Sequence, residues 1–142
     1  MKIYKANRKG LINYLLMGSI LLPVVIFFFD MRTFTESPLI LLPFLSPSTL
    51  LFWIYVDTFY KIENHHLIYH SAFLRGKIEI LTIKEIRKGE TMWSGVKPAL
   101  ASKGLIIKYN KYDDVYLAPE NNDEMIADLL EINPEIKLTV KH

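Results

Sequence analysis

The sequence predicts an N-terminal α-helical transmembrane hairpin followed by an α+β, mainly β, domain with antiparallel strands and one C-terminal helix. Two long stretches without a charged residue lie before residue 57, and an ordinary mixture of polar and apolar residues follows. From Thr58 onward apolar residues recur with a period of two, and one stretch of helical spacing comes near the end. We therefore divide the chain into residues 1–57, a basic tail with two membrane helices, and residues 58–142, the second domain.

The two uncharged stretches have the length of membrane spans. They cover residues 11–29 and 38–56, and a polar loop that begins with Asp30 joins them. A helix over the first stretch would be about 28 Å long, which matches the hydrocarbon core of a bilayer. A buried hairpin in a soluble core is disfavoured, because two such stretches seldom occur in so short a soluble chain. A cleaved signal peptide is disfavoured because no small-residue cleavage site follows Phe29.

The basic residues predict the orientation of the hairpin. The tail carries Lys2, Lys5, Arg8 and Lys9 without an acidic residue, whereas Arg32 is the single basic residue of the loop between the spans. The positive-inside rule therefore places the tail in the cytoplasm, and two spans return the chain to the same side. We expect a multi-pass protein of the cell inner (plasma) membrane with its N-terminus and C-terminal domain in the cytoplasm. The four basic tail residues are candidates for contact with anionic lipid.

Alternation of apolar and polar residues predicts a series of antiparallel strands in the second domain. A polar turn at residues 63–65 and a second turn at Arg75-Gly76 separate the first three strands. Residues 92–103 contain glycine, proline and serine and are expected to form a loop. The expected strands lie near residues 58–62, 66–73, 77–80, 105–109 and 115–117, and residues 83–91 are expected to form a short turn or a further strand.

A closing helix is predicted from about Glu120 to Ile132. Pro119 suits its first turn, and the acidic residues that follow complement the positive end of the helix dipole. The apolar stripe that should pack on the strands consists of Met125, Ile126, Leu129 and Leu130. Asn133-Pro134 ends the helix. Since short strands leave part of the sheet open, this helix is expected to cover one end or face of it.

The residues and their order resemble the pleckstrin-homology (PH) fold, and in particular small bacterial PH-like domains of the YyaB-like type. The resemblance covers about residues 57–138. It implies a PH-like domain, and members of this group often carry N-terminal membrane spans. A related group includes immunity proteins that protect producers of an antimicrobial peptide. The resemblance is carried by TFYKIENHHLIYHSAFLRGKIEI, by the Ile83-x-x-Ile86 step, by residues 99–102 before a strand, by Leu117-Ala118-Pro119 before the helix and by Pro134 after it.

No pattern of catalytic or cofactor-binding residues is recognisable. The chain has no cysteine. His66 and His70 would lie about 13 Å apart along one strand, too far to share a metal ion, and His65 belongs to a polar turn. The carboxylates are explained by turns and by the helix dipole. We therefore expect a protein that is not an enzyme and has no metal site, cofactor or nucleic-acid partner.

The segment with Met92, Trp93 and Lys97 is the candidate for contact with a partner. A tryptophan among glycine, proline and serine residues normally packs against something. Packing into the domain core is the interpretation that the sequence favours for Trp93, and a protein-binding surface is the alternative.

The leading functional hypothesis is a membrane-anchored PH-like interaction module that binds a protein or peptide at the cytoplasmic face, with self-protection against a membrane-active peptide as one such task. The alternatives are sensing of the lipid surface and service as an accessory structural subunit of a membrane complex. The first PH-like strand pair has Lys61 and Glu63 but no basic cluster at its turn, which departs from the pattern of phosphoinositide-binding PH domains.

Overall fold

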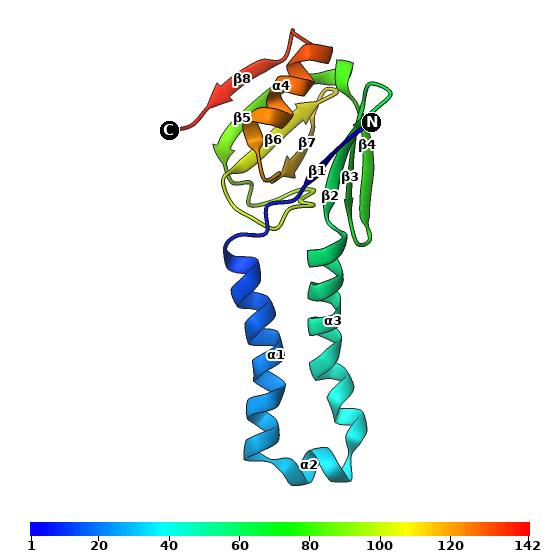
Figure 1. Ribbon diagram of the computed structural model, residues 1–142, viewed down its shortest axis with the longest axis vertical. Coiled ribbons are helices and arrows are strands. Elements are labelled where there is room, and N and C mark those ends of the chain that lie inside the picture. Colours follow the sequence, from blue (N-terminus) through cyan, green and yellow to red (C-terminus); the bar gives the residue numbers. More distant parts are fainter.

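The computed structural model describes all residues, 1–142. Two long antiparallel helices form a hairpin, and a β-rich domain lies at the end where the hairpin begins and finishes (Figure 1). The elements in chain order are β1 (Lys2–Lys5), α1 (Leu11–Phe29), α2 (Met31–Glu36), the 3₁₀ turn η1 (Pro38–Ile40), α3 (Leu41–Asp57), β2 (Phe59–Glu63), β3 (His66–Ser71), β4 (Leu74–Glu79), the 3₁₀ turn η2 (Ile80–Thr82), β5 (Ile83–Glu90), β6 (Gly104–Tyr109), β7 (Asp113–Leu117), α4 (Asn122–Ile132) and β8 (Lys137–Val140).

The hairpin has the properties of a pair of membrane spans. Both α1 and the segment Pro38–Asp57 are long and apolar enough to cross a bilayer, and only 11% and 0% of their apolar windows are buried. A core helix of a soluble protein would bury most of these side chains, so the exposed apolar surface fits a lipid environment. Between the helices, the Ser48 hydroxyl donates a hydrogen bond of 2.7 Å to the carbonyl oxygen of Ser19. This bond satisfies a polar side chain within the apolar hairpin.

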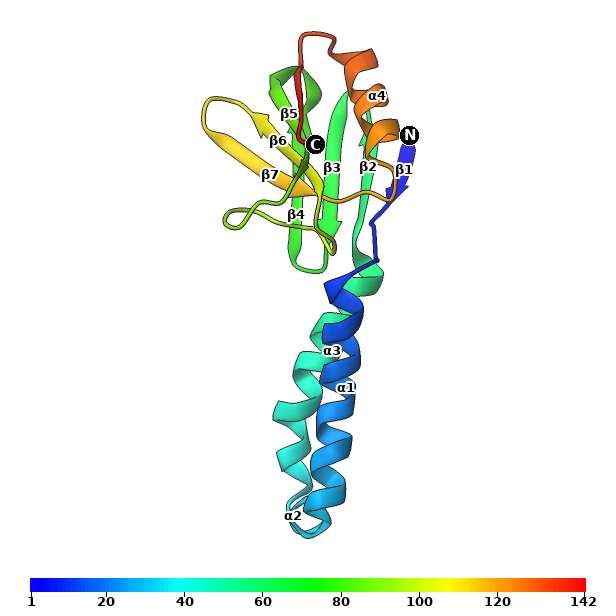
Figure 2. The same cartoon turned by 90° about the vertical axis from the view of Figure 1, so that its left-hand side faces the viewer.

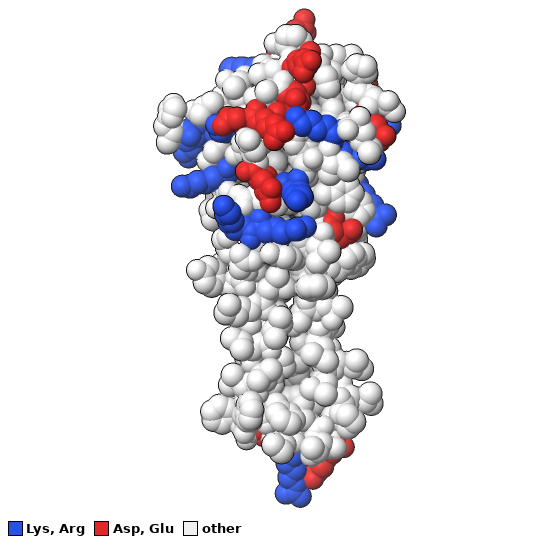
Figure 3. Space-filling view, in the orientation of Figure 1, with Lys and Arg blue, Asp and Glu red and all other residues white.

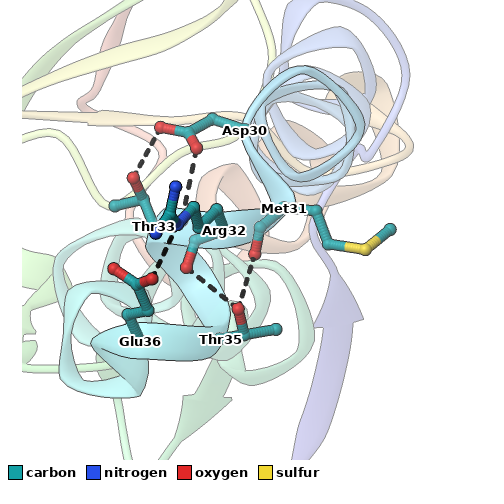
Figure 4. Close-up of polar contacts among 6 residues, drawn as sticks. All are labelled: Asp30, Met31, Arg32, Thr33, Thr35 and Glu36. Carbon is teal, nitrogen blue, oxygen red and sulfur yellow. Dashed lines mark hydrogen bonds and ion pairs between the residues drawn. The ribbon is translucent and has the colours of Figure 1, made fainter.

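The expected polar loop between the spans contains the short helix α2 (Figure 4). The Asp30 carboxylate accepts hydrogen bonds from the Thr33 amide at 3.2 Å and from the Thr33 hydroxyl at 2.6 Å. Such a side-chain cap satisfies an amide that the first helical turn would otherwise leave unpaired. Arg32 and Glu36, one turn apart, form an ion pair at 2.7 Å. The tip of the hairpin is therefore a short helix with a side-chain cap. All charged residues between the two apolar helices, Asp30, Arg32 and Glu36, lie in this helix or at its cap.

The domain consists of two four-stranded sheets with the strand orders β1-β2-β3-β4 and β7-β6-β5-β8. All neighbours are antiparallel except β8, which pairs parallel to β5. Helix α4 lies over the part of the domain that is away from the hairpin (Figure 2). It buries Met125, Ile126 and Leu129, and Leu130 packs at the edge of the same core. The predicted fold class and the packing of the apolar stripe are confirmed.

Strand β1 belongs to the domain, although the sequence grouped it with the membrane helices. It pairs antiparallel with β2 along its full length, from Lys2 opposite Ile62 to Lys5 opposite Phe59. The end of β1 and the residues after it bond to the segment that follows β7, because the Asn7 amide donates to the Ala118 carbonyl oxygen at 2.7 Å and the Lys5 carbonyl oxygen accepts from the Glu120 amide at 2.9 Å. The hairpin is thus inserted between two adjacent strands of one sheet. Four residues are too short for a recognisable alternation, and their partner strand lies far along the chain.

The second turn of the first sheet lies at Ala72-Phe73 and not at Arg75-Gly76. Gly76 stands inside β4, directly opposite Tyr69. A Cβ atom at Gly76 would lie 2.1 Å from the Tyr69 hydroxyl oxygen, so the tyrosine ring occupies the place of a side chain. The glycine therefore marks a close side-chain approach within a strand, which is the other common role of glycine in sheets.

Two further differences concern the C-terminal segment. Helix α4 begins after Asn121, whose side chain caps it by accepting from the Glu124 amide at 3.2 Å, while Pro119 lies before the helix and bridges to Ala6. After the helix, β8 adds an edge strand that the sequence pattern did not predict. A strand of this kind pairs through backbone groups, which leaves a weak pattern in the side chains.

A small polar cluster joins β1 to α4. The Lys2 ammonium nitrogen lies 2.5 Å from Asp128 and 2.9 Å from Glu124, and the Tyr4 hydroxyl donates to Asp128. The hydrogen bond from Lys2, and then the one from Tyr4, lowers the pKa of the Asp128 carboxyl. A carboxyl whose pKa is lowered by folding stabilises the fold above its unfolded-state pKa, and this contribution is lost as the pH falls through the lower, folded-state value.

We therefore predict that Asp128→Asn lowers the free energy of unfolding at neutral pH, and that the difference from the wild type shrinks as the pH is lowered past about 3.9, the ordinary aspartate pKa. Urea unfolding of the full-length protein in detergent, repeated over this pH range, measures the difference. Glu131→Gln is the matched control, because Glu131 is an exposed carboxyl on the same helix. A gap for Asp128→Asn that stays constant with pH would contradict the prediction.

Candidate functional site

A groove lies where the domain meets the first membrane helix. One wall is formed by the first turns of α1 and the other by the segment between β5 and β6. We call it the junction groove; its volume is about 320 Å³. Most of its lining is apolar, and the lining residues are Leu11, Ile12, Leu15, Thr91, Trp93, Lys97, Ala99, Leu100, Ala101 and Ser102. Leu11, Ile12 and Leu15 belong both to this groove and to the first turns of a helix that is long and apolar enough to cross a bilayer.

Met92 and Trp93 occupy opposite environments. Met92 is buried and packs with Ile106, Tyr116 and Ala118 in a small cluster of its own. The Trp93 side chain is 94% exposed. Packing of Trp93 into the core, the interpretation that the sequence favoured, is therefore wrong. The adjacent methionine takes the core position and directs the tryptophan outward at the rim of the junction groove.

The wall that carries Trp93 is fixed by two buried tyrosines. The Tyr60 hydroxyl donates to the Pro98 carbonyl oxygen at 2.7 Å and accepts from the Ala118 amide at 3.2 Å. The Tyr116 hydroxyl donates to the Ala101 carbonyl oxygen at 2.7 Å. Burial raises the pKa of the Tyr60 hydroxyl well above its usual range, so the hydroxyl keeps the proton that it donates. The groove is thus anchored to the core although its rim is exposed.

Basic side chains lie at this end of the domain on the face that Figure 3 shows. Lys and Arg gather there next to the uncharged part of the hairpin, and most of the Asp and Glu side chains of the domain lie farther from it. Lys97 lies with its ammonium nitrogen 5.2 Å from the centre of the Tyr116 ring. The Arg8 guanidinium carbon lies 5.2 Å from the centre of the Tyr55 ring. The same guanidinium group donates a hydrogen bond of 3.1 Å to the Val56 carbonyl oxygen, at the C-terminal end of α3, where the helix dipole is negative.

The four candidates for lipid contact do not lie together. Arg8 and Lys9 immediately precede α1, and Lys9 is exposed. Lys5 is exposed on β1. Lys2 lies at the other end of that strand, opposite Ile62, where it binds the carboxylates of α4. The geometry therefore leaves Arg8 and Lys9 next to the membrane helix and directs Lys2 to a structural ion pair.

His66 and His70, on the same strand β3, have different partners. His66 contacts the Asn64 carbonyl oxygen, whereas His70 lies 3.1 Å from the Asp57 carboxylate at the end of α3. No group of three or more His, Asp or Glu side chains has the spacing of a metal site. The structure thus combines a mainly apolar groove, which has Lys97 in its lining, with Arg8 and Lys9 just before α1.

A comparison with known protein families shows which family the domain belongs to. The profile described as "Bacterial PH domain" matches residues 58–133, which is more than half of the chain. The chain belongs to the bacterial PH domain family. The match covers β2 to α4; it leaves out β1, the hairpin and β8. The PH resemblance noted from the sequence is therefore confirmed. Outside the matched residues lie β1 and the hairpin on the N-terminal side and β8 on the C-terminal side.

One curated relative supports the same assignment. The chain is 25% identical over 93 residues to an uncharacterized protein, YyaB, of Bacillus subtilis (strain 168). The aligned part covers 65% of this chain and 64% of the relative, so the chain spans less than two thirds of the relative's length. No solved structure matches the chain. These comparisons relate the PH domain to a family without assigning it a ligand.

Tyr60→Phe tests how the groove wall is held. The substitution leaves the Pro98 carbonyl and the Ala118 amide without a partner in the core, so we expect a loss of about 1–3 kcal/mol in unfolding free energy and faster hydrogen exchange of the amides in residues 96–102. Tyr112→Phe is the control, because the Tyr112 side chain is 86% exposed. Equal exchange rates in the two variants would show that the Tyr60 hydroxyl does not hold this wall.

Proposed function

We propose that this protein is a membrane-anchored PH-like interaction module whose binding site is the junction groove. The observation that carries the proposal is the 94% exposed Trp93 at the rim of a mainly apolar groove with a membrane helix as one wall. An exposed tryptophan costs free energy in water, and such side chains dominate the energetics of interfaces when they become buried. The site therefore suits a ligand that reaches it along the membrane surface.

The ligand that fits best is an amphipathic segment of a protein or peptide. Its apolar face would cover Trp93, Leu100 and the first turn of α1, and an acidic residue would pair with Lys97 at the rim. A peptide that partitions into the interfacial region is already concentrated at this depth. Self-protection against a membrane-active peptide is one task that such a site would serve.

The sidedness of the hairpin follows from the charge distribution in this proposal. Arg8 and Lys9 lie at the end of the hairpin that carries the domain, while the α2 end has Arg32 paired with Glu36. The domain and the N-terminus are therefore cytoplasmic, and α2 faces outward across the plasma membrane.

A thiol reagent that does not cross membranes tests this orientation, since the chain has no cysteine of its own. In intact cells we expect labelling of Thr35→Cys in α2 and protection of Tyr112→Cys in the domain. After the membrane is permeabilised, both positions should react. Labelling of Tyr112→Cys alone in intact cells would invert the proposed orientation.

Photocrosslinking from the groove tests the ligand class. A benzophenone amino acid in place of Trp93 is expected to form a discrete adduct with a protein or peptide in native membranes, and the same amino acid in place of the exposed Tyr112 serves as the control. Challenge with a membrane-active peptide should be included, because a peptide ligand is absent from resting cells. Equal protein adducts at both positions, or none at position 93 under either condition, would contradict the proposal.

Sensing of the lipid surface is the second candidate. The observation in its favour is that Leu11, Ile12 and Leu15 belong to both the groove and a membrane span, so that lipid has direct access to the groove. An adduct at position 93 that contains lipid and no protein would favour this second function over peptide binding.

A further inference from the structure

The turn between β3 and β4 lies at the hairpin end of the domain. Strand β2 leads away from α3 and β3 returns, with Phe59 opposite His70. At the junction, the Thr58 and Ser71 hydroxyl oxygens lie 2.8 Å apart, and Thr58 also donates at 2.5 Å to the Ile54 carbonyl oxygen of α3. Because Ala72-Phe73 continues the chain past Ser71, the turn lies at the end of the domain where α3 finishes, as both views show (Figures 1 and 2).

The tip of this turn is unusually apolar. Phe73 is 66% exposed, whereas Ala72 beside it is fully buried and has a positive φ of 51°. Two-residue turns with a positive φ favour glycine, asparagine or aspartate. The turn at the opposite end of β3 follows that rule at Asn64, which has a positive φ of 50°. Phe73 is thus an exposed aromatic residue at the one end of the domain where it meets the helices.

The depth of Phe73 can be read from α3. The uncharged span ends at Val56, and Trp53 and Val56, which are 47% and 54% exposed, lie in the final turns. The turn at Ala72-Phe73 directly follows Ser71, whose hydroxyl oxygen lies 2.8 Å from that of Thr58 at the end of this helix. Arg75 is exposed, and its Nε atom donates to the Ala72 carbonyl oxygen at 3.2 Å. This hydrogen bond holds the guanidinium group next to the turn that carries Phe73. An aromatic residue next to a basic residue at the end of a span is typical of the membrane–water interface.

We propose that Phe73 inserts into the interfacial region of the leaflet and that Arg75 contacts its phosphate groups. The turn then gives the domain a membrane contact separate from the hairpin, on the α3 side, while the junction groove lies on the α1 side. The partner of this surface is the lipid bilayer. The inference does not depend on which ligand occupies the groove.

Spin labels at two matched positions test this contact in the full-length protein reconstituted into vesicles of phosphatidylcholine and phosphatidylglycerol. The chain has no cysteine, so Phe73→Cys and Leu81→Cys each provide a single attachment site. Leu81 is the control because it is 62% exposed, close to the 66% of Phe73, but lies in η2 at the opposite end of the first sheet. Collision of the label with oxygen reports lipid, and collision with a nickel chelate reports water.

We expect the label at position 73 to collide several-fold more with oxygen relative to the nickel chelate than the label at position 81. Equal ratios at the two positions would overturn the proposal. Low collision with both reagents at position 73 would also overturn it, since protein and not lipid would then cover the turn. Phe73→Trp in the background Trp53→Phe and Trp93→Phe gives an independent optical test. Its emission should be quenched by lipids brominated near the headgroup, and quenching by aqueous iodide alone would contradict the insertion.

Discussion

The pairing of β1 with β2 is the constraint on which the arrangement of this molecule depends. The two strands are neighbours in one sheet, and the membrane hairpin connects them. Helix α1 therefore leaves the domain within a few residues of the place where α3 returns to it. Backbone bonds from Lys5 and Asn7 to the segment after β7 tie the same tail to the second sheet. A connection at two adjacent strands restricts rotation of the domain much more than a single linker would.

Because of this constraint, the end of the PH domain next to the hairpin differs in its surface residues from the end away from it. Helix α4 and the polar turn Asn64-His65 occupy the end away from the hairpin, where Lys2 is held by carboxylates of α4. The end next to the hairpin carries the junction groove with Trp93 on one side and the turn with Phe73 on the other. Exposure of apolar side chains to water is unfavourable, whereas contact of the same side chains with a bilayer surface is favourable. In the proposed function, attachment and recognition are thus linked, because the fold places its exposed aromatic residues Trp93 and Phe73 at the end of the domain next to the hairpin (Figure 1).

The elements predicted well from the sequence are those with a strong local pattern. The uncharged run of α1 ends at the expected residues, and the stripe on α4 packs as its spacing predicts. The features that were missed depend on distant partners. Four residues of β1 gain their structure from β2, and Gly76 looked like a turn residue because nothing local reveals that Tyr69 lies against it. That misplaced turn hid Phe73 within a predicted strand. The outward direction of Trp93 depends on Met92 filling the adjacent cluster, which composition alone does not show.

The most direct test of this account is a cysteine pair across β1 and β2 in the full-length protein in native membranes. Ile3 stands directly opposite Lys61. Opposed residues in antiparallel strands have Cβ atoms about 4.5–5.5 Å apart, close enough for a disulfide with little adjustment. Ile3→Cys with Lys61→Cys should crosslink rapidly under mild oxidation. Ile3→Cys with Ile68→Cys, one strand farther away, should not. Failure of the first pair, or equal crosslinking of both, would show that the tail does not hold the hairpin against the domain.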